Sequence, residues 1–244
     1  MVVFLTNFIM LGIGILLNRK QQNPYFPLLL TGFETGMLGF SLFATVYGAS
    51  NINILGIVDL GQELYVWFVL VTMLYSLKDR AGSIKKVCGS FITSPVIIAI
   101  LSGLLLNFLG LRSFLIENPI ISGLLNTLNM VSQLSIPLIL MVIGYQLNFR
   151  LGQLRFPLKT ILWRMPILLI LAFIINELVL KNWLGLELIF RTALLVLFIL
   201  PPPFIIPLFM SNNKEGEVTY VNNTLSLGTL FTIVIFIIAA FFYQ

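Results

Sequence analysis

Long apolar runs separated by short polar stretches dominate the chain. Eight of these runs are about 20 residues long, the length of an α-helix that spans ~30 Å of hydrocarbon. They cover residues 1–17, 27–47, 54–77, 92–110, 120–147, 159–180, 187–209 and 222–243. The loops between them are too short for a soluble domain. The pattern therefore predicts an all-α polytopic membrane protein, with residues 1–244 forming one transmembrane domain of eight helices.

The amino-acid composition excludes several classes of protein function. Of all residues 59% are hydrophobic and only 9% are charged, whereas soluble domains carry about 25% charged residues. A single cysteine and the absence of histidine exclude an intramolecular disulfide, multi-cysteine and histidine metal sites, and histidine-based catalysis. We expect no enzyme activity, no resident cofactor, no metal and no nucleic-acid partner; the lipid bilayer is the expected surrounding.

Basic residues are concentrated on one side of the predicted membrane. The loops after the first, third, fifth and seventh segments contain eleven of them: Arg19, Lys20, Lys78, Arg80, Lys85, Lys86, Arg150, Arg155, Lys159, Arg164 and Lys214. The opposite loops contain three: Arg112, Lys181 and Arg191. Because basic loops stay in the cytoplasm, the chain is predicted to be a multi-pass protein of the cell membrane with both termini extracellular.

The seventh segment is interrupted by four prolines, Pro201, Pro202, Pro203 and Pro207. Each proline lacks a backbone donor, and its ring clashes with the carbonyl one turn earlier. Freed backbone groups are tolerated at membrane depth only where protein or a water-filled cavity satisfies them. The segment therefore predicts a broken helix beside a polar site. The alternative is a proline-kinked helix repaired by its neighbours.

The second segment contains Gly32, Gly36 and Gly39, each of which weakens a helix by about 1 kcal/mol relative to alanine. Glu34 lies among them, and a carboxylate in a bilayer usually faces a cavity or a partner. A second break is therefore predicted, with Glu34 as an ionisable coupling residue. The alternatives are a glycine packing face and a protonated glutamate that joins two helices.

Polar residues also recur in the third and eighth segments. Gln62 and Glu63 fall near the middle of the third, and Asp59 precedes Glu63 by one helical turn. Asn222 and Ser226 are likewise one turn apart at the start of the eighth segment. Both stripes are predicted to line a cavity. Asp59 could instead be interfacial, and the serines and threonines could bond only to their own backbone.

The two halves of the chain repeat one order of segments: a plain span, a broken span and a span with a polar stripe. The first broken span enters from the cytoplasm and the second from outside, so the halves are inverted. Inverted repeats with paired broken helices are typical of secondary transporters. Residues 1–77 are interpreted as a partial first repeat of three helices, and residues 88–244 as a second repeat of five.

Four blocks carry a family resemblance: GFETGMLGF (Gly32–Phe40), SPVIIAILSGLLLNFLGL (Ser94–Leu111), LSIPLILMVIGYQL (Leu134–Leu147) and PPPFIIPLF (Pro201–Phe209). With these the chain resembles the auxin efflux carrier family, including its bacterial malate permease-like members, and through it the fold of bile acid–sodium symporters. The family's Asn-Thr-Gly-Phe-Leu-Gly run falls on Glu34–Gly39, so that glutamate replaces asparagine. Ser41 stands where relatives have a crossover proline.

The resemblance implies ten helices in two inverted repeats with crossover helices, of which this chain lacks the first two. It also implies a secondary transporter of a small organic anion, malate-like or another carboxylate, coupled to H⁺ or Na⁺, and allows a homodimer. A truncated non-transporting protein or a regulatory subunit of the same fold is the alternative; an intramembrane lipid enzyme is disfavoured. The predicted substrate- or ion-binding residues are Glu34, Thr35, Gly36, Gly39, Gln62, Glu63, Pro202, Pro203, Asn222 and Ser226.

A transporter of this architecture requires the two breaks to lie close together. The two breaks, at Gly36–Gly39 and Pro201–Pro203, must lie within about 10 Å of each other, given ordinary helix packing distances. Around them a shared polar cavity is expected, lined by Glu34, Glu63, Asn222 and Ser226.

Overall fold

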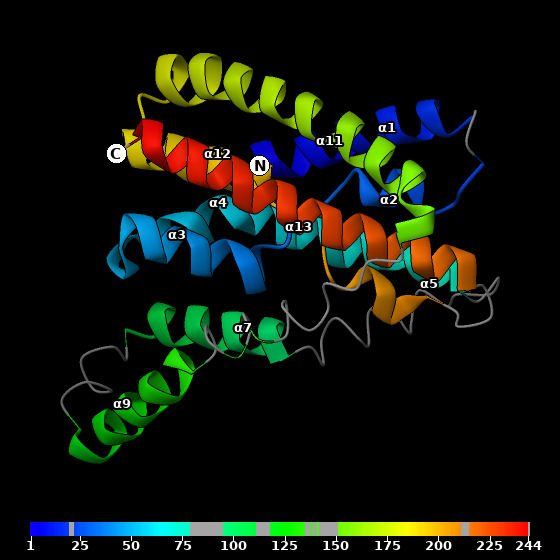
Figure 1. Cartoon of the computed structure of the whole chain (residues 1–244). Coiled ribbons are helices and arrows are strands. Elements are labelled where there is room, and N and C mark those ends of the chain that lie inside the picture. Colours follow the sequence, from blue (N-terminus) through cyan, green and yellow to red (C-terminus); the bar gives the residue numbers. More distant parts are fainter. Residues whose placement is uncertain are drawn as a thin grey trace.

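A computed structural model describes residues 1–19, 22–78, 95–110, 118–134, 138, 141, 151–210 and 215–243 (Figure 1). Every element in these ranges is helical, and none of the described residues forms a β-strand. The α-helices are α1 (Val2–Asn18), α2 (Phe26–Leu29), α3 (Phe40–Tyr47), α4 (Ile52–Tyr65), α5 (Val71–Lys78), α7 (Pro95–Phe108), α9 (Pro119–Gln133), α11 (Arg155–Ile174), α12 (Leu188–Ile199) and α13 (Glu215–Tyr243). Three π-helical stretches are η1 (Thr35–Gly39), η3 (Val66–Leu70) and η5 (Ile175–Trp183), and three 3₁₀ turns are η2 (Ala49–Asn51), η4 (Leu151–Gln153) and η6 (Ile206–Phe209).

Three continuous helical stretches are long and apolar enough to span a membrane: Ala49–Leu77, Arg155–Trp183 and Glu215–Ile238. Shorter apolar helices cover Val2–Asn18, Thr35–Tyr47 and Leu188–Ile199. The chain is thus a helical membrane protein. The predicted first, third, sixth and eighth segments each correspond to a continuous helical stretch, and the second and seventh are interrupted. Parts of the fourth and fifth, residues 92–94, 135–137, 139–140 and 142–147, lie outside the described residues.

Two helices begin earlier than the apolar pattern predicts. α13 starts at Glu215 instead of residue 222, and α11 starts at Arg155 instead of residue 159. Glu215 and Glu217 lie in the first turn of α13, where negative charge is favoured by the positive end of the helix dipole. Apolar content marks the part of a helix that can lie in hydrocarbon, so polar first turns escape a search based on it.

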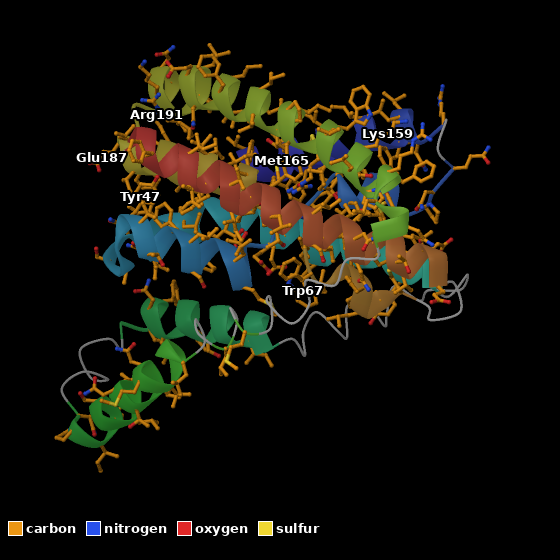
Figure 2. The ribbon with its side chains drawn as sticks, in the orientation of Figure 1. Tyr47, Trp67, Lys159, Met165, Glu187 and Arg191 are labelled. Carbon is orange, nitrogen blue, oxygen red and sulfur yellow. The ribbon has the colours of Figure 1, made fainter. Side chains whose placement is uncertain are left out.

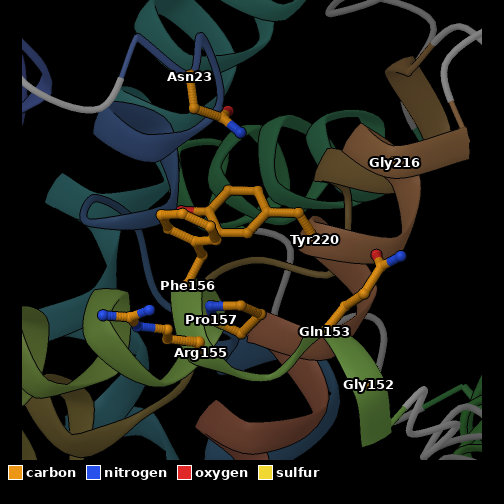
Figure 3. A pocket seen from close by; sticks show the side chains of 8 residues that line it. All are labelled: Asn23, Gly152, Gln153, Arg155, Phe156, Pro157, Gly216 and Tyr220. Carbon is orange, nitrogen blue, oxygen red and sulfur yellow. The ribbon is translucent and has the colours of Figure 1, made fainter.

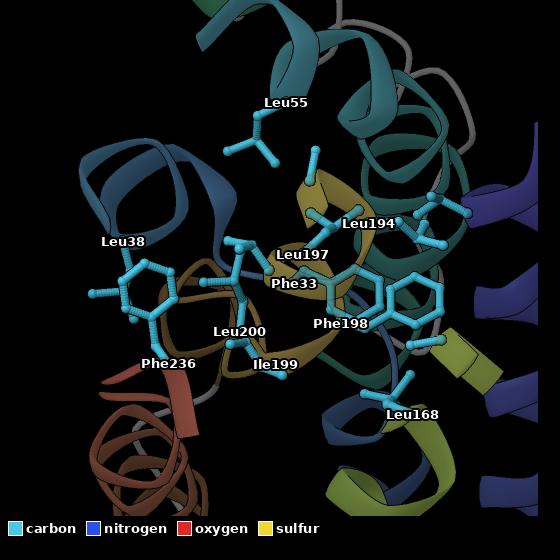
Figure 4. Packing of buried hydrophobic residues seen from close by; sticks show 14 of the residues in the cluster. Phe33, Leu38, Leu55, Leu168, Leu194, Leu197, Phe198, Ile199, Leu200 and Phe236 are labelled. Carbon is cyan, nitrogen blue, oxygen red and sulfur yellow. The ribbon is translucent and has the colours of Figure 1, made fainter. Parts of the chain in front are cut away.

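α12 occupies the centre of the bundle and packs against α4, α11 and α13. Its C-terminal half is buried, and Phe198 at that end stacks on Phe33 with ring centroids 5.2 Å apart. Leu200, Leu168 of α11 and Phe236 of α13 belong to the same buried cluster (Figure 4). α7 and α9 lie to one side of this bundle (Figure 1). The best-packed part of the protein therefore surrounds the ends of two interrupted segments.

Candidate functional site

The second predicted segment is broken, four residues before the position expected from its glycines. α2 ends at Leu29, and helical structure resumes at Thr35. Gly32 lies in the gap with φ +67°, a conformation that L side chains rarely adopt. A Cβ atom on Gly32 would also lie 2.5 Å from Cγ of Pro203. Gly36 and Gly39, where the break was predicted, are helical instead, because Gly32 has already provided the sharp turn.

The seventh predicted segment is broken at its prolines, as predicted. α12 ends at Ile199, the backbone is extended at Leu200, and a short 3₁₀ turn begins at Ile206. Pro201, Pro202 and Pro203 are all buried. None of these three has a backbone N–H to offer to a helix. This segment is an interrupted helix, and the alternative of a kinked but continuous helix is wrong.

The two breaks touch, which confirms the predicted proximity. The Glu34 amide donates a hydrogen bond to the Pro201 carbonyl oxygen at 3.0 Å. In return the Phe204 amide donates to Glu34 Oε2 at 2.6 Å, while the Met37 amide donates to Glu34 Oε1 at 3.1 Å. Both oxygens of one carboxylate are therefore engaged by backbone donors, one from each broken helix. Glu34 joins the two breaks.

Arg164 of α11 is the second residue that serves both breaks, and it is fully buried. Its guanidinium donates to four carbonyl oxygens, those of Leu29 (3.2 Å), Thr31 (3.3 Å), Gly32 (2.5 Å) and Leu200 (3.2 Å). Its Cζ also lies 5.2 Å from the centroid of the Phe33 ring, within the range of a cation–π interaction. No ion pair joins it to a carboxylate in the part of the chain that the structure describes. Backbone dipoles and an aromatic face thus stabilise this cation.

Arg164 is not one of the loop residues that set the topology, so that prediction was wrong. The residue lies well inside α11, nine positions after the first residue of that helix. Its place within the apolar run 159–180 was the available signal, because an isolated charge inside such a run usually faces a partner. The remaining loop residues still leave a basic excess of ten against three.

Side chains from three further helices satisfy other backbone groups at the breaks. Asn7 of α1 accepts a hydrogen bond from the Gly32 amide at 2.7 Å. Gln62 of α4 bonds to both backbone groups of Phe33, accepting from its amide at 3.2 Å and donating to its carbonyl at 2.5 Å. Thr232 of α13 donates to the Ile199 carbonyl. Polar residues spaced far apart in sequence therefore converge on one junction.

Acidic side chains gather beside the first break. Asp59 of α4 is 4% exposed, and its carboxylate lies close enough to those of Glu63 and Glu34 for mutual repulsion. Glu63 is half-buried and accepts a hydrogen bond from Trp67 Nε1 at 3.1 Å; Trp67 is labelled in Figure 2. Asp59 is therefore buried inside the protein. Among the described residues, no group of three or more Asp, Glu, Cys or His side chains is arranged to hold a metal ion.

Most of the predicted site residues lie at or beside the junction of the two breaks. Glu34, Thr35, Gln62, Pro202 and Pro203 are buried at or beside the junction. Gly39 is close to the second break, since a Cβ on it would lie 2.7 Å from Cδ1 of Leu200. Gly36 is exposed.

The predicted polar stripe of α13 is buried except at its first residue. Asn222 is exposed. Ser226 and Thr229, which follow it on the same helical face, are buried, as are the neighbouring Asn223 and Thr224. Gly228 brings α13 against the second break, with Cβ space limited by Pro201 and Pro202 at 3.1 and 3.2 Å.

A separate pocket of about 520 Å³ lies at one end of the bundle (Figure 3). Residues from the chain before α2, the start of α11 and the start of α13 line it: Asn23, Gly152, Gln153, Arg155, Phe156, Pro157, Gly216 and Tyr220. Tyr220 is anchored there by a 2.7 Å hydrogen bond to Thr160. None of the predicted site residues lines this pocket. Arg164 lies about 13 Å further along α11 than Arg155, from the helical rise, so the pocket is distinct from the junction.

Comparison of the chain with known protein families, curated proteins and solved structures finds no match.

Proposed function

We propose that this protein is a secondary transporter of a small organic anion, malate-like or another carboxylate, coupled to H⁺ or Na⁺, with the architecture of the auxin efflux carriers it resembles. The observation that supports this is the direct contact between two interrupted helices inside an otherwise apolar bundle. In secondary transporters, substrate and coupling-ion sites are formed by paired discontinuous helices, where unwound backbone groups meet. A junction of that kind costs stability in a membrane protein and is retained for a function.

The charges at the junction favour an anionic solute with a cation as its companion. Arg164 supplies a buried positive charge that no carboxylate of the described residues neutralises by an ion pair. The Thr35–Tyr47 helix begins at the same place, with its positive dipole end at the break. Three carboxylates lie beside the first break, at positions 34, 59 and 63. An anion entering here would meet both signs of charge, so a coupled cation would lower the repulsion.

The experiment that tests this proposal is uptake into proteoliposomes. Radiolabelled malate, succinate and acetate are offered to vesicles that contain the full chain, under an imposed proton or Na⁺ gradient. We expect gradient-driven accumulation of at least one carboxylate, which is lost in Glu34→Gln because an amide has only one oxygen to accept the two N–H groups. Protein-free vesicles are the control. Uptake no greater than in that control for every carboxylate and both gradients would refute the proposal.

The basic residues support an orientation for this transporter. Lys159 lies near one end of the bundle and Glu187 near the other (Figure 2), and the C-terminus lies at the end opposite the start of α11 (Figure 1). We propose that the Lys159 end faces the cytoplasm and that both termini are extracellular. A fluorescent reporter that matures only in the cytoplasm, fused after Gln244, should stay dark, whereas the same reporter inserted after Gly152 should fluoresce. The reverse pattern would overturn this orientation.

A further inference from the structure

Asp59 is a buried acid that the junction does not use. The side chain is 4% exposed, and its Oδ1 atom makes no hydrogen bond to another described residue. Burying an ionised carboxylate without a partner is costly enough that such a group usually binds a proton or a cation. Asp59 therefore needs a ligand that the hydrogen bonds of the two breaks do not provide.

Thr35 provides an independent indication of the same need. It is 1% exposed, and its Oγ1 atom also lacks a hydrogen-bond partner among the described residues. Thr35 lies beside the Asp59 carboxylate, although no hydrogen bond of normal geometry joins Thr35 Oγ1 to Asp59 Oδ1. A hydroxyl can both donate and accept, so it can serve a carboxylate and a carboxylic acid equally. Thr35 directly follows Glu34, which places this pair next to the contact between the breaks.

Among the described residues, the charged side chains that repel Asp59 are Glu63 and Glu34, and the buried cation of the junction, Arg164, is bound by four carbonyl oxygens. Glu63 lies one turn further along α4, and Glu34 lies at the first break. The other elements packed against α4 bring no free cation: α1 and α3 carry no charged side chain, and Arg191 of α12 is paired with Glu177. The amino group of Met1 approaches Gly61, two residues from Asp59 and so about 200° around the helix. None of the ion pairs among the described residues therefore involves Asp59.

The three acids differ in the donors they receive. Glu34 accepts two backbone N–H bonds, so each of its two oxygens has a donor. Glu63 is only half-buried and accepts the Trp67 indole N–H. Asp59 is the most buried of the three and has an oxygen without any donor.

We infer that Asp59 and Thr35 form a proton-binding site beside the junction, and that Glu34 is a positioning residue for the two breaks. A proton taken from water neutralises the Asp59 carboxylate, and the resulting O–H donates to the Thr35 oxygen. When the proton leaves, the Thr35 O–H donates to the carboxylate instead. This inference deepens the proposed function, on which its role in coupling rests, by naming H⁺ as the coupling ion and Asp59 as its carrier.

Infrared difference spectroscopy tests the site without any solute. The purified full chain in lipid vesicles is switched between acidic and alkaline buffer, and the carbonyl stretch of protonated carboxyl groups is recorded. We expect a band in the wild type that is lost in Asp59→Asn and retained in Glu34→Gln and in the exposed control Glu187→Gln. Thr35→Val should shift this band, because the acid loses its hydrogen-bond acceptor, whereas Thr35→Ser should leave it in place.

Several results would overturn the assignment. A band that persists unchanged in Asp59→Asn, or one that is lost in Glu34→Gln, would place the proton elsewhere. A band that Na⁺ abolishes at constant pH would show that the site holds a metal cation. If Asp59→Asn does not fold, the Thr35→Val and Thr35→Ser pair decides, and identical bands in both would also refute the site. Because no solute is present, a failure of transport would leave this result standing.

Discussion

The two breaks interrupt their helices by different chemistry, and their surroundings differ accordingly. The first turns at a glycine, so each of its residues keeps both an N–H and a carbonyl that require partners. Asn7 and Gln62 supply acceptors there, and Gln62 and Arg164 supply donors. The second is built from prolines, which have no N–H. It needs mainly donors, and these come from Arg164, Thr232 and the Glu34 amide.

A proline break and a glycine break can share one junction because each supplies what the other needs. The proline break exposes carbonyl oxygens, and the glycine break next to it contributes an N–H, that of Glu34, to one of them. Arg164 then supplies donors to both breaks from a third helix. A guanidinium suits this place because it offers five N–H groups in a fixed plane and accepts none.

Removing the shared donor should have the largest effect on both breaks. Arg164→Met leaves four carbonyl oxygens without their guanidinium partner. Each buried acceptor left unsatisfied costs about 1–3 kcal/mol, so we expect a loss of several kcal/mol or failure to fold. Thermal unfolding in detergent, followed by size-exclusion chromatography, measures this. The exposed Arg155→Met is the control, and equal unfolding temperatures for the two variants would contradict the shared role.

The glycine break should be more sensitive than the proline break to loss of a side-chain amide. Gln62→Met removes both an acceptor for the Phe33 amide and a donor for its carbonyl. We expect a destabilisation of roughly 2–4 kcal/mol from the two unpaired groups. The exposed amide of Asn222 provides the control variant Asn222→Ala. The same unfolding assay applies, and a cost for Gln62→Met near that of the control would show that water replaces the amide.

The conformation of the first break can be tested separately from its hydrogen bonds. Gly32→Ala forces a side chain into positive φ and against Pro203, and strain of this kind costs about 1–3 kcal/mol. Gly36→Ala is the matched variant, since the nearest atom to a Cβ there is 3.9 Å away. We expect Gly36→Ala to be neutral or stabilising. If both variants unfold at the wild-type temperature, Gly32 and Pro203 are not in close contact in the protein.

The smallest effect is expected at the second break. Thr232→Val removes the hydroxyl that bonds to Ile199 across two helices, which should cost about 1 kcal/mol, as is typical for one hydrogen bond. Thr229→Val removes a hydroxyl that bonds only to Leu225 in its own helix, and we expect less effect. A larger loss for Thr232→Val than for Gln62→Met would invert the comparison between the two breaks.

The amino-acid sequence by itself determined the membrane class, the helical content and the location of the proline break. These features depend on local properties: an apolar run of sufficient length needs no partner to be recognised, and prolines interrupt a helix wherever they stand. Glu34 and Gln62 could also be found in this way, because polar groups within apolar runs are rare. The position of the first break was missed by four residues, since any of the three glycines could turn the chain. Pro203 leaves no room for a side chain at Gly32, and this contact is known only from the tertiary structure.

Only the tertiary structure decided which polar groups meet. Arg164 and Leu29 are separated by 135 positions, and Glu34 and Phe204 by 170, so no local pattern links them. The same holds for α13, where Asn222 is exposed although Ser226, one turn further along the same face, is buried. Buried backbone groups must be paired, but which side chain pairs with them depends on how the helices pack around the two breaks.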